Sequence, residues 1–146
     1  MSPTTGAILS MIKENLGIEM TVEQVEWGYF LGDLSQRNYQ MFLTGWIADY
    51  ADSENFMDIL FHSSSSQNHT GYQNIHVDEL LERARAEADT NSRTALYRET
   101  EQIVVTEAAC IPLTHGLTHT LVKPYVKGFE VSAGLYPWLK DIHLEK

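Results

Sequence analysis

The sequence predicts an α/β fold with a small parallel or mixed sheet flanked by helices. Hydrophobic and polar residues alternate over Ile18–Val22, which is the pattern of a half-buried strand. A helical stripe follows over residues 27–34, and a short apolar run over residues 39–46 is typical of a buried strand. Strand, helix and strand within about thirty residues form a βαβ unit, whose strands run parallel with a right-handed crossover.

A helix is expected before this unit, from about Thr5 to Leu16. Its apolar residues recur at helical spacing, and Gly17 provides a stop signal. After the unit, Asp52 or Ser53 can cap a short helix. This helix is expected to bury the apolar side chains Phe56, Met57, Leu60 and Phe61.

A helical hairpin is expected next. Asn74 can cap its first helix, and a break at residues 89–91 separates it from the second. The apolar residues that face inward are Val77, Leu80, Leu81 and Ala84 in the first helix and Leu96, Ile103 and Val104 in the second. Residues 111–122 return to an alternating, strand-like pattern, and little regular pattern follows Pro124.

Charge and hydropathy exclude several classes of protein. Ten Lys and Arg against twenty Asp and Glu give a net charge of −10, which disfavours nucleic acid and anionic lipid as partners. The apolar stretches are too short to span a bilayer, and no basic-then-apolar leader opens the chain. The chain is therefore cytosolic, or lost a leader, or is a piece of a longer protein.

The sequence favours neither a metal site nor an enzyme, so no cofactor, metal ligand or catalytic residue is expected. His115 and His119 could share a metal on a helix, but on the expected strand they stand about 13 Å apart. Cys110, the single cysteine, excludes an internal disulfide and is expected to be a buried thiol. Nucleophile-elbow and phosphate-binding motifs are absent.

Residues 46–50 are the candidate binding site. Ligands of open α/β sheets bind beyond the carboxyl ends of strands, and Asp49 and Tyr50 directly follow the strand expected to end at Trp46. A tryptophan provides a flat apolar wall, and a carboxylate is a strong partner for an ammonium group. In the competing interpretation, Trp46 belongs to the core and Asp49 is a turn residue bonded to its own backbone.

Several motifs resemble one protein family. The stretch Gly45–Phe56 is similar to the Gly-Trp-x-x-Asp-Tyr-x-Asp-Pro-x-x-Phe motif of the bacterial extracellular solute-binding proteins of family 5, the oligopeptide- and dipeptide-binding proteins of ABC importers. Further similar segments follow in the family's order, namely Gly71–Asn74 with Asp78–Leu81, Arg93–Ile103, Ile111–Leu113 and Val122–Phe129.

The resemblance implies a fold and a site. The fold is a lobe of a type II periplasmic binding protein, with residues 1–123 forming the ligand-binding lobe and residues 124–146 a tail that returns to the other lobe. Asp49 would pair with the α-ammonium group of a short peptide. The site would comprise Trp46, Ile47, Ala48, Asp49 and Tyr50, with the backbone of residues 46–48 along the peptide main chain.

The resemblance also implies partners and a location. These are a short peptide, the importer's permease subunits and the missing amino-terminal lobe, in the periplasm or outside the cell at the membrane, with self-association through the uncovered cleft. The chain departs from the family pattern at Ala51 and Ser53, where many members have proline. The nearest guanidinium to the motif is Arg37, so the ligand's length stays open. Alternatives are a receptor for an oligosaccharide or a nickel or haem complex, and the sensor lobe of a cytosolic regulator.

Overall fold

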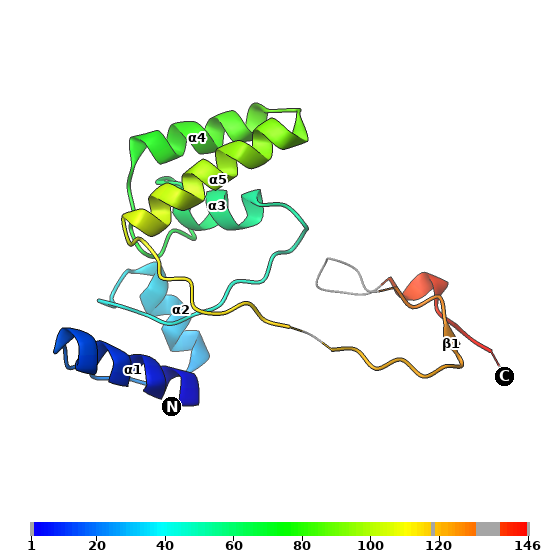
Figure 1. The fold of residues 1–146 in the computed structure, drawn as a ribbon, viewed down its shortest axis with the longest axis horizontal. Helices are drawn as coiled ribbons and strands as arrows, with labels where there is room; N and C mark the ends of the chain where they lie inside the picture. The colour runs from blue at the N-terminus through cyan, green and yellow to red at the C-terminus, as the bar shows by residue number, and fades with distance from the viewer. Residues whose placement is uncertain (1, 118, 131–137, 146) are drawn as a thin grey trace.

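The chain is mostly helical. A computed structural model describes residues 2–117, 119–130 and 138–145. Its elements are α1 (Pro3–Leu16), α2 (Trp27–Ser35), α3 (Glu54–Phe61), α4 (Ile75–Ala86), α5 (Thr90–Thr106), β1 (Val126–Lys127), the 3-10 turn η1 (Leu139–Asp141) and β2 (His143–Leu144). Among them, α3, α4 and α5 pack on one another as a three-helix unit (Figure 1).

The predicted helices are confirmed, and local signals explain their ends. Helix α1 ends at Gly17, which takes the left-handed conformation at φ 68° and donates its N–H to the Lys13 carbonyl. Helix α4 begins after Asn74, whose side chain accepts hydrogen bonds from the backbone N–H groups of His76 and Val77. Helix α5 begins slightly earlier than expected, because Asp89 caps it through the N–H of Ser92.

The hydrophobic core lies inside the three-helix unit. Its buried members are Phe61 of α3, the α4 residues Val77, Leu81 and Ala84, and the α5 residues Tyr97 and Val104. Burying a side chain of this size contributes about 1.5–3 kcal/mol, so this unit contains most of the chain's apolar stabilisation. Cys110 packs against the core partly buried, and burial raises the pKa of its thiol.

Helix α3 buries most of its predicted apolar residues together with two polar ones, since Phe61 is buried and Met57 and Leu60 pack partly buried against the core. Phe56 is exposed, whereas Asn55 and Asp58 are buried beside Phe61. Residues 55, 58 and 61 share one face because helical neighbours recur every three or four positions. Two polar side chains thus take buried positions in α3, and both have partners that the structure shows.

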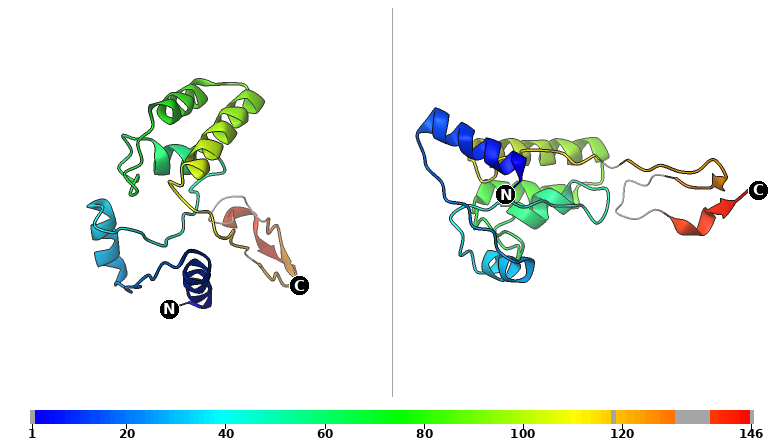
Figure 2. Two further views of the ribbon diagram at one scale, coloured as in Figure 1. Left: turned by 60° about the vertical axis from the view of Figure 1, so that its left-hand side comes forward. Right: turned by 90° about the horizontal axis from the view of Figure 1, so that it is seen from below.

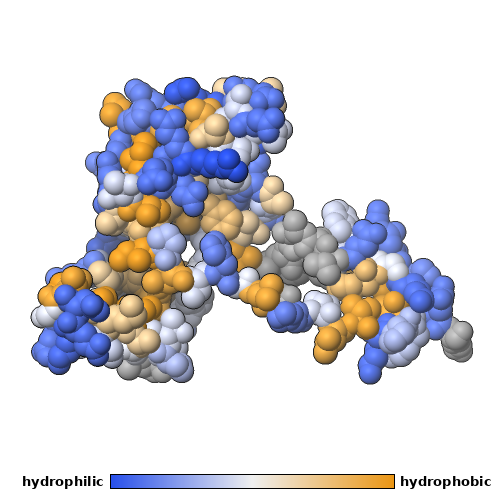
Figure 3. Space-filling view, viewed as in Figure 1, coloured by the Kyte–Doolittle hydropathy of each residue, from blue (hydrophilic) through white to orange (hydrophobic). Residues whose placement is uncertain are grey.

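Helices α1 and α2 lie apart from the three-helix unit, and the segment carrying β1, η1 and β2 extends away from it (Figures 1 and 2). Hydrophobic residues gather on the surface over α1 and α2 (Figure 3). Met11, Leu16 and Trp27 are among the exposed apolar side chains there. No helix in the described parts of the chain is long and apolar enough to cross a membrane.

The described residues do not form the predicted parallel sheet. Segments 18–22, 39–46 and 111–122 pair with no neighbour there, and the sheet that forms is the antiparallel pair β1–β2, with Val126 opposite Leu144. An alternating pattern shows that a segment suits a sheet, but a strand also requires a hydrogen-bonded neighbour. The apolar side chains of these segments are mostly exposed as a result, including Ile18, Met41, Leu43, Leu117 and Leu121.

Candidate functional site

The segment Gly45–Tyr50 lies within the connection between α2 and α3 and contains every residue predicted to bind ligand. Trp46 and Ala48 are half-buried, whereas Ile47, Asp49 and Tyr50 are exposed. No described residue pairs with the main-chain N–H or C=O groups of Ile47 and Ala48. The segment therefore has main-chain groups without a described partner beside a partly covered tryptophan.

Asn55, in the first turn of α3, anchors this segment. Its side-chain Oδ1 accepts one hydrogen bond from the indole Nε1 of Trp46, at 3.0 Å, and another from the backbone N of Asp49, at 3.2 Å. Asn55 itself is fully buried. The buried Oδ1 of Asn55 thus holds both the Trp46 indole ring and the Asp49 backbone, the two groups predicted to contact a ligand.

Asp52 fixes the start of α3 against α5. Its Oδ1 accepts a hydrogen bond from the backbone N of Glu54 at 2.9 Å, and its carboxylate forms a bidentate ion pair with Arg93, with N–O distances of 2.7 and 2.8 Å. The Arg93 guanidinium also lies 5.4 Å from the centre of the Tyr97 ring. Tyr97 and Asp52 together raise the pKa of Arg93.

Three of the four carboxylates between residues 49 and 58 have partners. Asp52 pairs with Arg93, Glu54 accepts a hydrogen bond from the Tyr50 hydroxyl, and Asp58 pairs with Arg85. The bond to Glu54 raises the pKa of Tyr50, and the bond to Asp58 raises the pKa of Arg85. The Asp49 carboxylate has no hydrogen bond or ion pair with any described residue, so it is the acid of this group that is available to a ligand.

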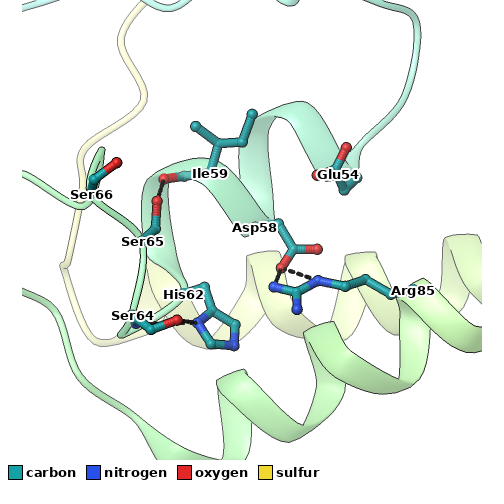
Figure 4. A pocket seen from close by; sticks show the side chains of 8 residues that line it. All are labelled: Glu54, Asp58, Ile59, His62, Ser64, Ser65, Ser66 and Arg85. Atoms are coloured by element: carbon teal, nitrogen blue, oxygen red, sulfur yellow. Dashed lines mark hydrogen bonds and ion pairs between the residues drawn. The ribbon is translucent and has the colours of Figure 1, made fainter.

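A polar cavity of about 320 Å³ lies beside α3, lined by Glu54, Asp58, Ile59, His62, Ser64, Ser65, Ser66 and Arg85 (Figure 4). Its lining includes none of residues 46–50. Within it, the Ser64 hydroxyl is 2.9 Å from Nδ1 of His62. The cavity is therefore separate from the predicted binding segment.

The other sequence candidates lie elsewhere. Arg37, considered as a partner for a ligand carboxylate, donates a hydrogen bond to the Asn68 carbonyl at 3.2 Å and so ties the end of α2 to the loop before α4. His115 and His119 are both exposed in the unpaired segment 111–122. Within the described ranges, no group of three His, Cys, Asp or Glu side chains is arranged to hold a metal ion.

Sequence did not predict two features of the site. These are the anchoring of residues 46 and 49 by Asn55 and the pairing of Arg93 with Asp52. Arg93 lies 41 positions from Asp52, so no local pattern connects them. Asn55 had a local signal, because it lies on the face of α3 that includes Phe61, where an amide is buried only with a partner.

The chain is similar to proteins of known type. Residues 2–68 match the family model of the bacterial extracellular solute-binding proteins, family 5 Middle. The periplasmic oligopeptide-binding protein OppA of Salmonella typhimurium is 32% identical over 123 residues, which are 84% of this chain and 22% of that protein. The probable deoxycholate-binding periplasmic protein YgiS of Escherichia coli is 30% identical over 143 residues, which are 97% of this chain and 26% of that protein.

A solved structure supports the same relationship. The periplasmic binding protein DppA of Helicobacter pylori, in complex with the peptide STSA, has a TM-score of 0.76 and 26% identity, and the match covers 99% of this chain and 29% of that one. The chain thus spans between about a fifth and a third of the length of these relatives. The predicted relationship to one lobe of a type II periplasmic binding protein is confirmed, and the chain belongs to the bacterial extracellular solute-binding proteins of family 5.

Proposed function

We propose that residues 46–50 form part of the ligand-binding surface of a substrate-binding protein of an ABC-type importer, and that the ligand is a short peptide anchored at Asp49. Two of the relatives described above are peptide-binding by name or by bound ligand. The observation that carries the anchor is the Asp49 carboxylate, which alone among the four acids of residues 49–58 has no described partner.

The chemistry of the segment suits a peptide of variable sequence. An ammonium group at the peptide's amino terminus would form a charge-assisted hydrogen bond with Asp49. The free main-chain groups of Ile47 and Ala48 would pair with the peptide main chain, whose hydrogen bonds do not depend on side-chain identity. Trp46 would cover one side of the ligand. This function is binding and release, without a chemical step.

The proposal extends to the surroundings of the site. Most of each relative's length lies outside the matched part, and we propose that a second lobe closes over the peptide. The partners would then be that lobe and the importer's permease subunits, and the location would be the periplasm or the outer face of the membrane.

Calorimetric titration of the intact protein with short peptides tests the anchor. Free and amino-acetylated forms of the same peptides would be compared for the unsubstituted protein and for Asp49→Asn. We expect acetylation or the substitution to weaken binding by about 2–5 kcal/mol, the usual loss when one partner of a buried charge pair is removed. Glu79→Gln, which removes an exposed carboxylate of α4, is the matched control and should bind like the unsubstituted protein.

The possible outcomes separate the parts of the proposal. Binding that ignores both acetylation and Asp49→Asn would keep the peptide receptor but remove Asp49 from its role. Binding of deoxycholate, an oligosaccharide or a metal complex, with none of any peptide, would contradict the peptide assignment.

A further inference from the structure

Asn55 is a buried amide whose side-chain hydrogen bonds are both accepted by its oxygen, Oδ1. Its Oδ1 accepts from Trp46 Nε1 and from the Asp49 backbone, whereas its buried Nδ2 makes no hydrogen bond of ordinary geometry with a described residue, although the Asn55 side chain is near enough to the Tyr50 hydroxyl to oppose the rise in the pKa of Tyr50. A buried donor without a partner lowers stability, and an apolar side chain of the same shape would avoid this loss. The two bonds accepted by Oδ1 are therefore the structural contribution of the amide at this position.

Asn68 provides the comparison. It is as deeply buried as Asn55, but all its polar groups have partners. Its Nδ2 donates to the carbonyls of Tyr72, at 2.7 Å, and His62, at 3.3 Å, and its Oδ1 accepts from the Tyr72 backbone and the Thr70 hydroxyl. Asn68 thus stabilises its own loop, whereas Asn55 acts on a segment six to nine residues earlier.

Asn55 is itself held in position through Asp52, the residue two positions before α3. Its backbone N donates to the Asp52 carbonyl at 3.2 Å, and the Asp52 side chain is held by Arg93 of α5. A continuous chain of bonds therefore runs from α5 through Asp52 and Asn55 to Trp46 and Asp49. It connects the three-helix unit to the partly exposed segment 46–50.

We propose that Asn55 is the positioning residue of the binding segment, which holds the Trp46 ring and the Asp49 backbone so that the Asp49 carboxylate faces the ligand. This inference rests on the proposed function for its ligand, but the two hydrogen bonds exist independently of any ligand. Asn55 touches no ligand in this scheme, because it is fully buried behind the segment.

Asn55→Leu tests the inference, since leucine has a similar shape and accepts no hydrogen bond. The first readout is hydrogen exchange of the Trp46 indole N–H by NMR, with its signal assigned as the one lost in Trp46→Phe. The second is peptide affinity of the intact protein. We expect the exchange rate and the dissociation constant each to rise about tenfold or more, the scale of one or two lost hydrogen bonds.

Two further variants separate positioning from general damage. Asn55→Gln keeps an uncharged amide oxygen as acceptor and should restore part of the slow indole exchange and of the affinity. Asn68→Leu removes an equally buried amide without contact to residues 46–49, so it should lower stability but leave Trp46 exchange and affinity within about twofold. Asn55→Ala replaces the leucine variant if the latter does not fold.

Unchanged affinity in Asn55→Leu, while the unsubstituted protein binds peptides, would overturn the inference and leave the proposed function standing. The same conclusion follows if Asn68→Leu weakens binding as much as Asn55→Leu does. If the unsubstituted protein binds no peptide, the proposed function fails, and with it the role of Asn55 in binding.

Discussion

Asp52 has two partners at once, the backbone N–H of Glu54 and the guanidinium of Arg93. The first bond starts α3 and the second connects α3 to α5. Ser53, at the N-cap position itself, makes no side-chain capping bond, so the residue before it performs this role. A single carboxylate thereby joins the chain just after the candidate binding segment to the three-helix unit.

At this scale we predict that the Asp52–Arg93 pair is coupled more strongly than an exposed pair. Its side chains are 27% and 31% exposed, whereas those of Glu19 and Lys13, whose charged atoms are 2.6 Å apart, are 76% and 65% exposed. Double-mutant cycles with Asp52→Asn and Arg93→Leu, read by urea unfolding, should give a coupling of about 1 kcal/mol.

The Lys13–Glu19 pair is the control, and its coupling should be below about 0.5 kcal/mol. Equal couplings for the two pairs would contradict the role given to Arg93, because bidentate geometry and partial burial would then contribute nothing.

At the scale of residues, sequence points to the candidate binding segment but not to the residues that hold it. Trp46 and Asp49 could be singled out because they follow an apolar run and match a family motif. Whether Asp49 is available depends on where Arg93 and Arg85 lie, and these are placed by packing of α4 and α5. Long-range pairing of this kind leaves no local pattern in a sequence.

Among the elements, helices could be predicted because their signals are local. The stop at Gly17 and the cap at Asn74 each act within one turn. The strands expected at 18–22, 39–46 and 111–122 could not be verified from sequence, because their formation depends on a neighbour that the pattern does not specify. The β1–β2 pair was missed for the opposite reason, since two-residue strands are too short to alternate detectably.

Helices α4 and α5 are also connected at their ends by a hydrogen-bonded cluster. Glu107, which follows α5, accepts from the Tyr72 hydroxyl at 2.6 Å and from Nδ2 of Asn74, the cap of α4, at 3.0 and 3.1 Å. These bonds lower the pKa of Glu107 below its ordinary 4.5. Burial and the bond to Glu107 raise the pKa of Tyr72 from 10.0 to about 12.

We therefore predict two limbs in the pH dependence of stability. The contribution of Glu107 is present above about pH 4.5 and is lost as pH falls through its lowered pKa; that of Tyr72 is complete below pH 10 and is lost as pH rises toward 12. Urea midpoints measured against pH should show a shallower acid limb in Glu107→Gln and a shallower alkaline limb in Tyr72→Phe.

Tyr29→Phe is the control for loss of a hydroxyl, because Tyr29 is exposed on α2 and its hydroxyl has no described hydrogen bond. The cluster would lose its assigned role if all three variants retained the pH profile of the unsubstituted protein.

Across the whole molecule, packing is uneven. The three-helix unit contains the core, whereas segment 111–122 is neither helical nor paired among its described residues and exposes most of its side chains. Local opening is easiest where few buried contacts and backbone bonds must break. The molecule therefore combines a stable helical unit with chain that keeps its place through few contacts.

We predict that chymotrypsin cleaves at Leu121 before it cleaves at Tyr29. Both side chains are well exposed, at 98% and 75%, but Tyr29 lies within α2 and Leu121 lies in the unpaired segment. A protease needs an extended backbone, and Leu121 should be cut first although tyrosine is the better chymotrypsin residue. Mass spectrometry of early fragments, with urea-unfolded protein as the control, makes the comparison. Earlier cleavage at Tyr29 would show that α2 opens more readily than segment 111–122.

The exposed apolar segments and the acidic composition together govern colloidal behaviour. At neutral pH a net charge of −10 makes copies of the chain repel one another, which opposes contact between their uncovered hydrophobic side chains. Acidification toward the isoelectric point of about 4.9 removes this repulsion while leaving the apolar surface in place. Mild acid should therefore precipitate the protein, and high salt, which screens the same repulsion, should lower its solubility even at pH 7.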